Sequence, residues 1–144
     1  MFKRIVVAYN ESPEAGRALA SAIRLAKLVE AELQVVTVVQ ELPAYTAYAT
    51  AGDSSLTRTL REDRSQRYEQ MQAAVRATAL REGVAPVTHL LEGDEVDALV
   101  GFLLRDRPDL LVIGLHPHAS HVSRLWSTVY GIAQDAPCSV LGVH

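Results

Sequence analysis

Three histidines lie close together in the chain, at positions 116, 118 and 121. Imidazole rings are common ligands of zinc, nickel and copper, and this spacing could bring two or three rings to one ion. The same rings, once protonated, could contact phosphate oxygens. Neither a cysteine nor a pair of carboxylates accompanies them, and exposed loops also contain polar residues without a special role. We therefore expect no resident metal, and the candidate ligands of a metal-responsive module are His116, His118 and His121.

A second group of polar residues could bind an anion. Ser127 and Thr128 are expected among the first residues of a helix, and Arg124 lies shortly before them. The first N–H groups of a helix have no partner within it, so together with two hydroxyls and a guanidinium they could hold a phosphate. Serine and threonine are also ordinary helix caps. This segment therefore predicts either an anion site or a capped helix.

Apolar runs of strand length alternate with segments of helical periodicity along the chain. The first helix is expected to begin after a cap at Ser12, with Pro13 at its first position. The second is expected to cover residues 57–82, the third to follow a cap at Asp94 as far as Pro108, and the last to cover 126–134. The segment 40–56 has no clear period and is expected to form a loop. The expected strands cover residues 2–9, 33–39, 86–91, 110–113 and 138–143.

Two of these helices have a predicted buried face, because their apolar residues recur at helical spacing. The face of helix 57–82 is expected to comprise Leu60, Tyr68, Met71, Val75 and Ala79. The face of the helix after Asp94 is expected to comprise Val96, Leu99, Val100, Leu103 and Leu104.

The alternation predicts an α/β fold in a single domain over residues 1–144: a five-stranded parallel, Rossmann-like sheet with helices on both faces. The usual strand order, 3-2-1-4-5, places the reversal of winding between the first and fourth strands. Loops diverge at such a switch point and leave a crevice. The two loops that meet there contain Asn10, Glu11 and Ser12 and residues 114–121. These loops are the predicted site.

The composition excludes several classes of protein. Of 144 residues, 49% are hydrophobic and 22% charged, as in a globular domain. The net charge of −3 argues against nucleic acid as a partner, because proteins that bind it normally carry a basic excess. No apolar run approaches the roughly 18 residues of a membrane span, so no membrane partner is expected. The single cysteine, Cys138, cannot form an internal disulfide, and without a signal pattern we expect a cytoplasmic protein.

Several segments, in the right order and over essentially the whole chain, resemble the universal stress protein family. They are IVVAYNES at 5–12, LQVVTVV at 33–39, EGD at 92–94, DLLVIG at 109–114 and APCSVL at 136–141. The resemblance implies a sheet like that of the adenine nucleotide alpha hydrolases. It also implies that nucleotide-binding members carry the pattern G-x2-G-x9-G-[ST] after the fourth strand. The glycines and the hydroxyl of this pattern approach phosphates, an aspartate after the first strand meets the ribose, and hydrophobic residues frame the adenine.

This chain matches that pattern in part. Gly114 fits the first glycine and Thr128 the hydroxyl position, whereas Pro117 and Ser127 stand where the second and third glycines are expected. Asn10 stands in place of the aspartate. The resemblance thus implies a cofactor-binding set of Ala8, Asn10, Val38, Ile113, Gly114, Pro117, Arg124, Ser127, Thr128 and Val129.

Each departure has a physical consequence. Pro117 has no N–H to donate and cannot reach positive φ, and Ser127 adds a side chain where close backbone approach was needed. Asn10 could still accept a hydrogen bond from a ribose hydroxyl through its carbonyl oxygen, without charge assistance. We therefore expect weak or no ATP binding, whereas AMP or another small nucleotide remains a possible ligand.

The resemblance also implies a homodimer, formed by pairing of the last strand, residues 138–143, with its mate. The expected function is that of a stress-response and regulatory protein with a degenerate adenine-nucleotide pocket and no catalytic residues. Three alternatives stay open: a member that does bind ATP or AMP, a metal-responsive module, and a nucleotide hydrolase in which a histidine activates Ser120 or Ser123.

Overall fold

Five parallel strands form the sheet, in the order β3-β2-β1-β4-β5, as the sequence predicted. The computed structural model describes residues 1–40, 54–116 and 122–144, with the backbone alone described at 54 and 122–127. Residues 41–53 of the expected loop 40–56 lie outside the described residues. Residues 54–56 belong to a helix instead of the loop, so that helix begins earlier than the predicted 57. The strands are β1 (Arg4–Ala8), β2 (Glu32–Val39), β3 (Val87–Glu92), β4 (Leu110–Gly114) and β5 (Ser139–Val143).

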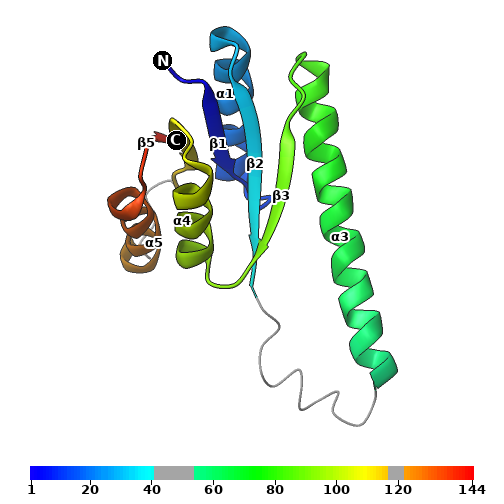
Figure 1. Ribbon diagram of the computed structural model, residues 1–144. Helices are drawn as coiled ribbons and strands as arrows, with labels where there is room; N and C mark the ends of the chain where they lie inside the picture. The colour runs from blue at the N-terminus through cyan, green and yellow to red at the C-terminus, as the bar shows by residue number, and fades with distance from the viewer. Residues whose placement is uncertain (41–53, 117–121) are drawn as a thin grey trace.

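Helices cover both faces of this sheet (Figure 1). They are α1 (Pro13–Val29), α3 (Ser54–Arg81), α4 (Glu95–Asp106) and α5 (Val122–Asp135). One core cluster joins residues of α1 and α3 to one side of the central strands, and a second joins residues of α4 and α5 to the other side. The central strands are nearly continuous buried runs because apolar helices cover both of their faces. No helix in the described part of the chain is long and apolar enough to cross a membrane.

Two helices begin at side-chain caps that the sequence predicted. The Ser12 hydroxyl accepts a hydrogen bond from the Ala15 N–H at 3.2 Å, and Pro13 occupies the first turn, where its missing N–H has no consequence. The carboxylate of Asp94 accepts from the N–H groups of Val96 and Asp97, both at 3.1 Å. Both caps lie at the edge of the sheet where the predicted site was placed.

The predicted buried face of α4 is wrong at Leu104. Leu104 is 55% exposed, whereas Phe102, which the prediction omitted, is 7% exposed and belongs to the core. On a helix, Phe102 and Leu104 lie about 160° apart on opposite sides of Leu103, so only one of the two can share the sheet-facing side with Leu103. Phe102 and Leu103 lie on either side of the line of contact and fill it.

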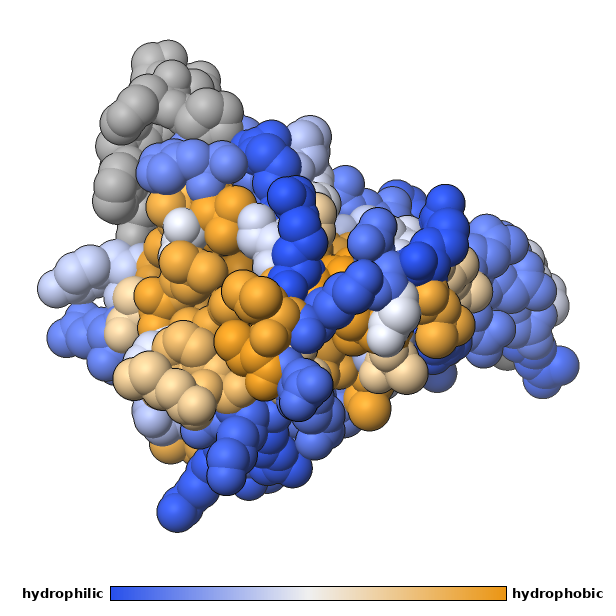
Figure 2. Space-filling view, turned by 90° about the horizontal axis from the view of Figure 1, so that it is seen from above, coloured by the Kyte–Doolittle hydropathy of each residue, from blue (hydrophilic) through white to orange (hydrophobic). Residues whose placement is uncertain are grey.

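The predicted buried face of α3 is correct only in the second half of the helix. Met71, Val75 and Ala79 are buried, Tyr68 is half-buried, and Leu60 is 37% exposed. The first half of α3 extends past the ends of the strands (Figure 1), so its apolar positions have no sheet beneath them. Hydrophilic residues dominate the α3 side of the molecule when it is seen from above, whereas apolar residues gather over the opposite part of that face (Figure 2).

Gly114, at the end of β4, lies against the first turn of α1. A Cβ atom at this position would lie 2.8 Å from the amide nitrogen of Ala15 and still closer to the carbonyl group of Glu14. Both neighbours are backbone atoms of a capped helix start, so neither can move aside cheaply. Glycine is therefore required here by packing, whatever the pocket binds.

We predict that Gly114→Ala lowers the free energy of unfolding by about 1–3 kcal/mol, because it forces α1 away from β4. The matched control is Gly16→Ala, in the same helix, where an added Cβ would meet nothing within 4 Å. That change should raise the free energy of unfolding by about 0.5–1 kcal/mol, since alanine favours helix. Urea denaturation followed by circular dichroism measures both values. Equal effects of the two substitutions would contradict this account of Gly114.

Candidate functional site

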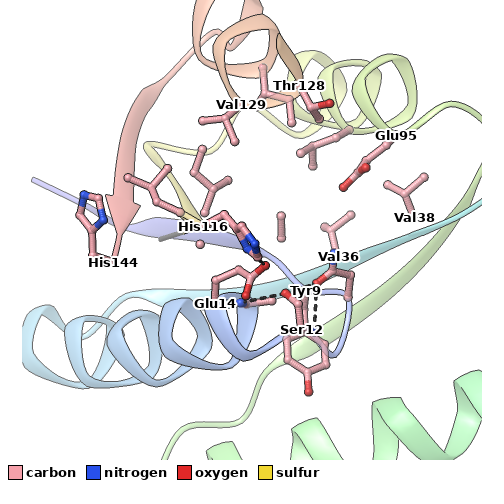
Figure 3. Close-up of a pocket in the computed structure, with 18 residues that line it drawn as sticks. Tyr9, Ser12, Glu14, Val36, Val38, Glu95, His116, Thr128, Val129 and His144 are labelled. Atoms are coloured by element: carbon pink, nitrogen blue, oxygen red, sulfur yellow. Dashed lines mark hydrogen bonds and ion pairs between the residues drawn. The ribbon is translucent and has the colours of Figure 1, made fainter. Parts of the chain in front are cut away.

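A cavity of about 420 Å³ lies at the carboxyl ends of the central strands. The ends of β1, β2 and β4 form its floor, and the first turns of α1 and α4 together with the middle of α5 form its walls (Figure 3). This is the edge of the sheet at which the order of strands reverses. The cavity therefore occupies the switch point that the sequence predicted.

Most of the predicted site residues that the structure describes line this cavity. They are Ala8, Asn10, Val38, Ile113, Gly114, Thr128 and Val129. Pro117 lies outside the described residues, and at Arg124 and Ser127 only the backbone is described. The fold thus brings the two predicted loops together, and the binding role of these residues stays a prediction.

Several lining residues were missing from the predicted set. Val36, Leu99 and Ile132 extend the apolar wall, and Tyr9, Ser12, Glu14, Ala15, Glu95, Leu115, His116 and His144 complete the lining. Among these, Ser12, Leu115 and His116 lie in the two loops predicted to form the site, and His116 was also a metal candidate. The signal for Glu14 and Glu95 was present, because each follows a predicted cap at the carboxyl edge of the sheet. An acidic residue in a first helical turn is usually read as a partner of the helix dipole alone.

The amide oxygen of Asn10 is engaged within its own loop. It accepts hydrogen bonds from the N–H of Ser12 at 3.2 Å and from the hydroxyl of Ser12 at 2.6 Å. The Ser12 hydroxyl in turn caps α1. The predicted contact between this oxygen and a ribose hydroxyl would therefore have to replace one of these bonds.

A histidine–carboxylate pair crosses from the end of β4 to the start of α1. The Nδ1 atom of His116 lies 2.8 Å from Oε1 of Glu14, and the side chains are 46% and 18% exposed (Figure 3). The backbone N–H of Glu14 and, after it, the His116 ring hold the pKa of the Glu14 carboxyl below its ordinary value. The pair closes one side of the cavity and adds a second link between the two loops.

The start of α5 differs from its prediction. The helix begins at Val122 instead of near Trp126, so Ser127 and Thr128 lie more than one turn inside it. Only the first four N–H groups of a helix lack an intrahelical partner, and here these belong to residues 122–125. The predicted anion seat built on the N–H groups of Ser127 and Thr128 is therefore wrong. Thr128 still contributes to the lining of the cavity.

Of the three histidines proposed as metal ligands, the structure describes one. His116 bonds Glu14, and His118 and His121 lie outside the described residues. Within residues 1–40, 54–116 and 122–144, no group of three side chains of the kinds that bind metals is close enough to hold an ion. A metal site that includes His118 and His121 stays a prediction.

We predict that Glu14→Gln lowers the free energy of unfolding at pH 7 by a few tenths of a kcal/mol up to about 1, because solvent partly screens the carboxylate. The pKa of Glu14 is lower in the folded than in the unfolded protein, so its stabilisation is complete above the unfolded value. It is lost as the pH falls through the folded value. The melting temperatures of wild type and Glu14→Gln should therefore differ at pH 6–7, and the difference should shrink as the pH is lowered through the acid range.

The control for this prediction is Glu69→Gln, an exposed position on α3. That substitution should leave the melting temperature close to wild type over the whole range. A difference between wild type and Glu14→Gln that grows toward acid pH would contradict the predicted sign.

Comparison with known proteins assigns the chain to a family. Over residues 1–144 it matches the universal stress protein family. The comparison with curated proteins found no match. Among solved structures, the universal stress protein UspA from Lactobacillus plantarum is 19% identical, with a TM-score of 0.77 over 99% of this chain and 98% of that one.

Two other solved structures were determined with nucleotides. A universal stress protein in complex with cAMP is 23% identical, with a TM-score of 0.67 over 99% of this chain and 97% of that one. The universal stress protein from Archaeoglobus fulgidus in complex with dAMP is 21% identical, with a TM-score of 0.65 over 99% and 98%. At these identities the structures show a shared fold. Together with the family match over its whole length, they show that the chain belongs to the universal stress protein family.

Proposed function

We propose that this protein is a cytoplasmic, homodimeric regulatory protein whose cavity binds an adenine ligand with at most one phosphate. The observation that carries the proposal is the shape of the switch-point cavity: apolar walls over the strand ends, beside a helix α5 that begins before the expected phosphate-binding positions. No catalytic residue is proposed; Ser120 and the side chain of Ser123, the candidates of the hydrolase alternative, lie outside the described residues.

The apolar walls suit a flat aromatic base. Val36, Val38 and Ile113 come from the floor strands β2 and β4, and Leu99 and Val129 come from α4 and α5, which cover this face of the sheet. Apolar side chains therefore line both the floor and the helical walls. A purine between such side chains removes apolar surface from water on both of its faces. Two relatives of the same fold were solved with the adenine monophosphates cAMP and dAMP, which supports a ligand of this class.

The expected triphosphate cradle departs from the family pattern at Pro117 and Ser127. Gly114 is retained, but its backbone packs against α1. Pro117 has no N–H to donate, and the backbone at Ser127 and Thr128 is part of the helix. One phosphate could still be held at the first N–H groups of α5. Among the residues that the structure describes, a chain of three phosphates has no comparable set of donors, which favours AMP over ATP.

Support for the homodimer comes from the edge strand β5. It pairs with β4 on one side, and no described strand covers its other side. Leu141 on this strand is 39% exposed. Exposed apolar edge strands are usually paired or covered, and pairing with a second copy would do so. The single cysteine is consistent with the reducing conditions of the cytoplasm.

We predict that titration calorimetry detects AMP binding at least about ten-fold tighter than ATP binding. Val38→Trp should abolish AMP binding, because the indole fills the cavity. The matched control is Val87→Trp, on β3 outside the cavity, which should bind AMP like the wild type. Tight ATP binding by the wild type would favour the alternative of a true ATP-binding member.

A separate prediction concerns the dimer. Leu141→Lys should shift the protein from dimer to monomer in sedimentation equilibrium, because it places a charge on the proposed strand pair. Leu80→Lys, at a 59% exposed position on α3, is the control and should leave the dimer intact. A wild-type protein that sediments as a monomer would contradict the proposal.

A further inference from the structure

We propose that Glu95 sets the charge selectivity of the cavity, by disfavouring each phosphate that a ligand carries. The inference rests on the proposed function and names the residue that makes the site prefer adenosine and AMP to ATP. The inference follows from the positions at which α1, α4 and α5 begin beside the cavity, and from the acidic side chains in the first turns of α1 and α4.

The first turn of α4 would ordinarily attract an anion. Helix N-termini carry a partial positive charge and free N–H groups, and phosphates bind there in many proteins. Here Asp94 accepts two of those N–H groups, and Glu95 and Asp97 add two more carboxylates to the same turn. The chain's own negative charges therefore already occupy the positive end of this helix.

The first turn of α1 has the same arrangement. The Ser12 hydroxyl accepts one of its N–H groups, and Glu14 places a carboxylate in the turn. This carboxylate pairs with His116. By contrast, the first turn of α5 contains no acidic residue. Of the three described helices whose residues line the cavity, only α5 therefore starts with its positive end uncompensated by an acidic side chain of its first turn.

Glu95 is the acidic residue that brings this charge into the cavity itself. Its side chain extends from α4 toward the middle of the cavity, between Thr128 and Val38 (Figure 3). Among the described lining residues the charged or titratable groups are Tyr9, Glu14, Glu95, His116 and His144, without a lysine or arginine. Asp97, in the same turn, does not line the cavity. A phosphate placed on the apolar floor would therefore meet the negative charge of Glu95, whose exposed side chain extends over the cavity from α4.

The experiment measures the affinities of adenosine, AMP and ATP for the full-length protein and two variants. Glu95→Gln removes the charge and keeps the shape of the side chain. Asp97→Asn removes the same charge from the same turn, outside the cavity, and is the matched control. Calorimetry is performed at low ionic strength and repeated in about 0.5 M NaCl, where the Debye length falls to roughly 4 Å.

Glu95→Gln should tighten ATP binding about three- to ten-fold, AMP binding by less, and adenosine binding by less than about two-fold. High salt should reduce the gain for ATP. Asp97→Asn should change all three affinities by less than about two-fold. The expected gain in affinity thus increases with the number of phosphates. A loss of packing or of stability would not produce such a graded response.

Two results would overturn the inference while leaving the proposed function intact. In the first, wild type binds adenosine or AMP, but Glu95→Gln changes the affinities for adenosine, AMP and ATP by the same factor or not at all. The other is an equal effect of Asp97→Asn, which would assign the selectivity to the helix end as a whole. Failure of every adenine ligand to bind wild type and Glu95→Gln would overturn the proposed function and this inference together.

Discussion

The contact between Gly114 and the first turn of α1 is the constraint on which the site depends. It joins the end of β4 to the start of a helix that lies about a hundred residues earlier in the chain. The two backbones are so close that no Cβ atom would fit between them. The next residue is fixed too: the Leu115 N–H donates to the Val143 carbonyl at 2.7 Å, and the Leu115 side chain packs on Gly142. The floor of the cavity is thus built from backbone that packing holds in place. A glycine that resembles a phosphate-binding residue has, in this chain, a sufficient structural role of its own.

Several polar groups around the cavity form hydrogen bonds with one another. Asn10 bonds Ser12, Ser12 caps α1, and Glu14 pairs with His116. These bonds stabilise the loops, and they leave an apolar surface between them for a ligand. A ligand that displaced these bonds would have to supply equivalent ones, because they hold the two loops together. Such a site favours ligands recognised through a flat apolar face over ligands recognised through many charges.

The sequence was sufficient to predict the sheet, its order and the position of the cavity. Strand and helix patterns alternate without ambiguity, and the rules of parallel sheets then determine which loops meet. The sequence was not sufficient where two nearby residues could each occupy a core position or each mark the start of a helix. Phe102 and Leu104 flank Leu103 on opposite sides of α4, and the periodicity alone did not show that the Phe102 side faces the core. The start of α5 was misplaced because Ser127 and Thr128 also look like a cap. Glu95 was missed because a carboxylate after a cap is typical of any helix, and only the fold shows that this one lines a cavity.

The most direct test of the central claim is the identity of the nucleotide that the protein retains. Untagged protein is purified without added nucleotide and denatured, and the released small molecules are quantified by liquid chromatography with mass spectrometry. The account predicts adenosine or AMP as the adenine compound recovered, in amounts that fall in Val38→Trp. Recovery of ATP at one molecule per chain would contradict it, because the cavity would then accommodate three phosphates for which the described residues provide no cradle.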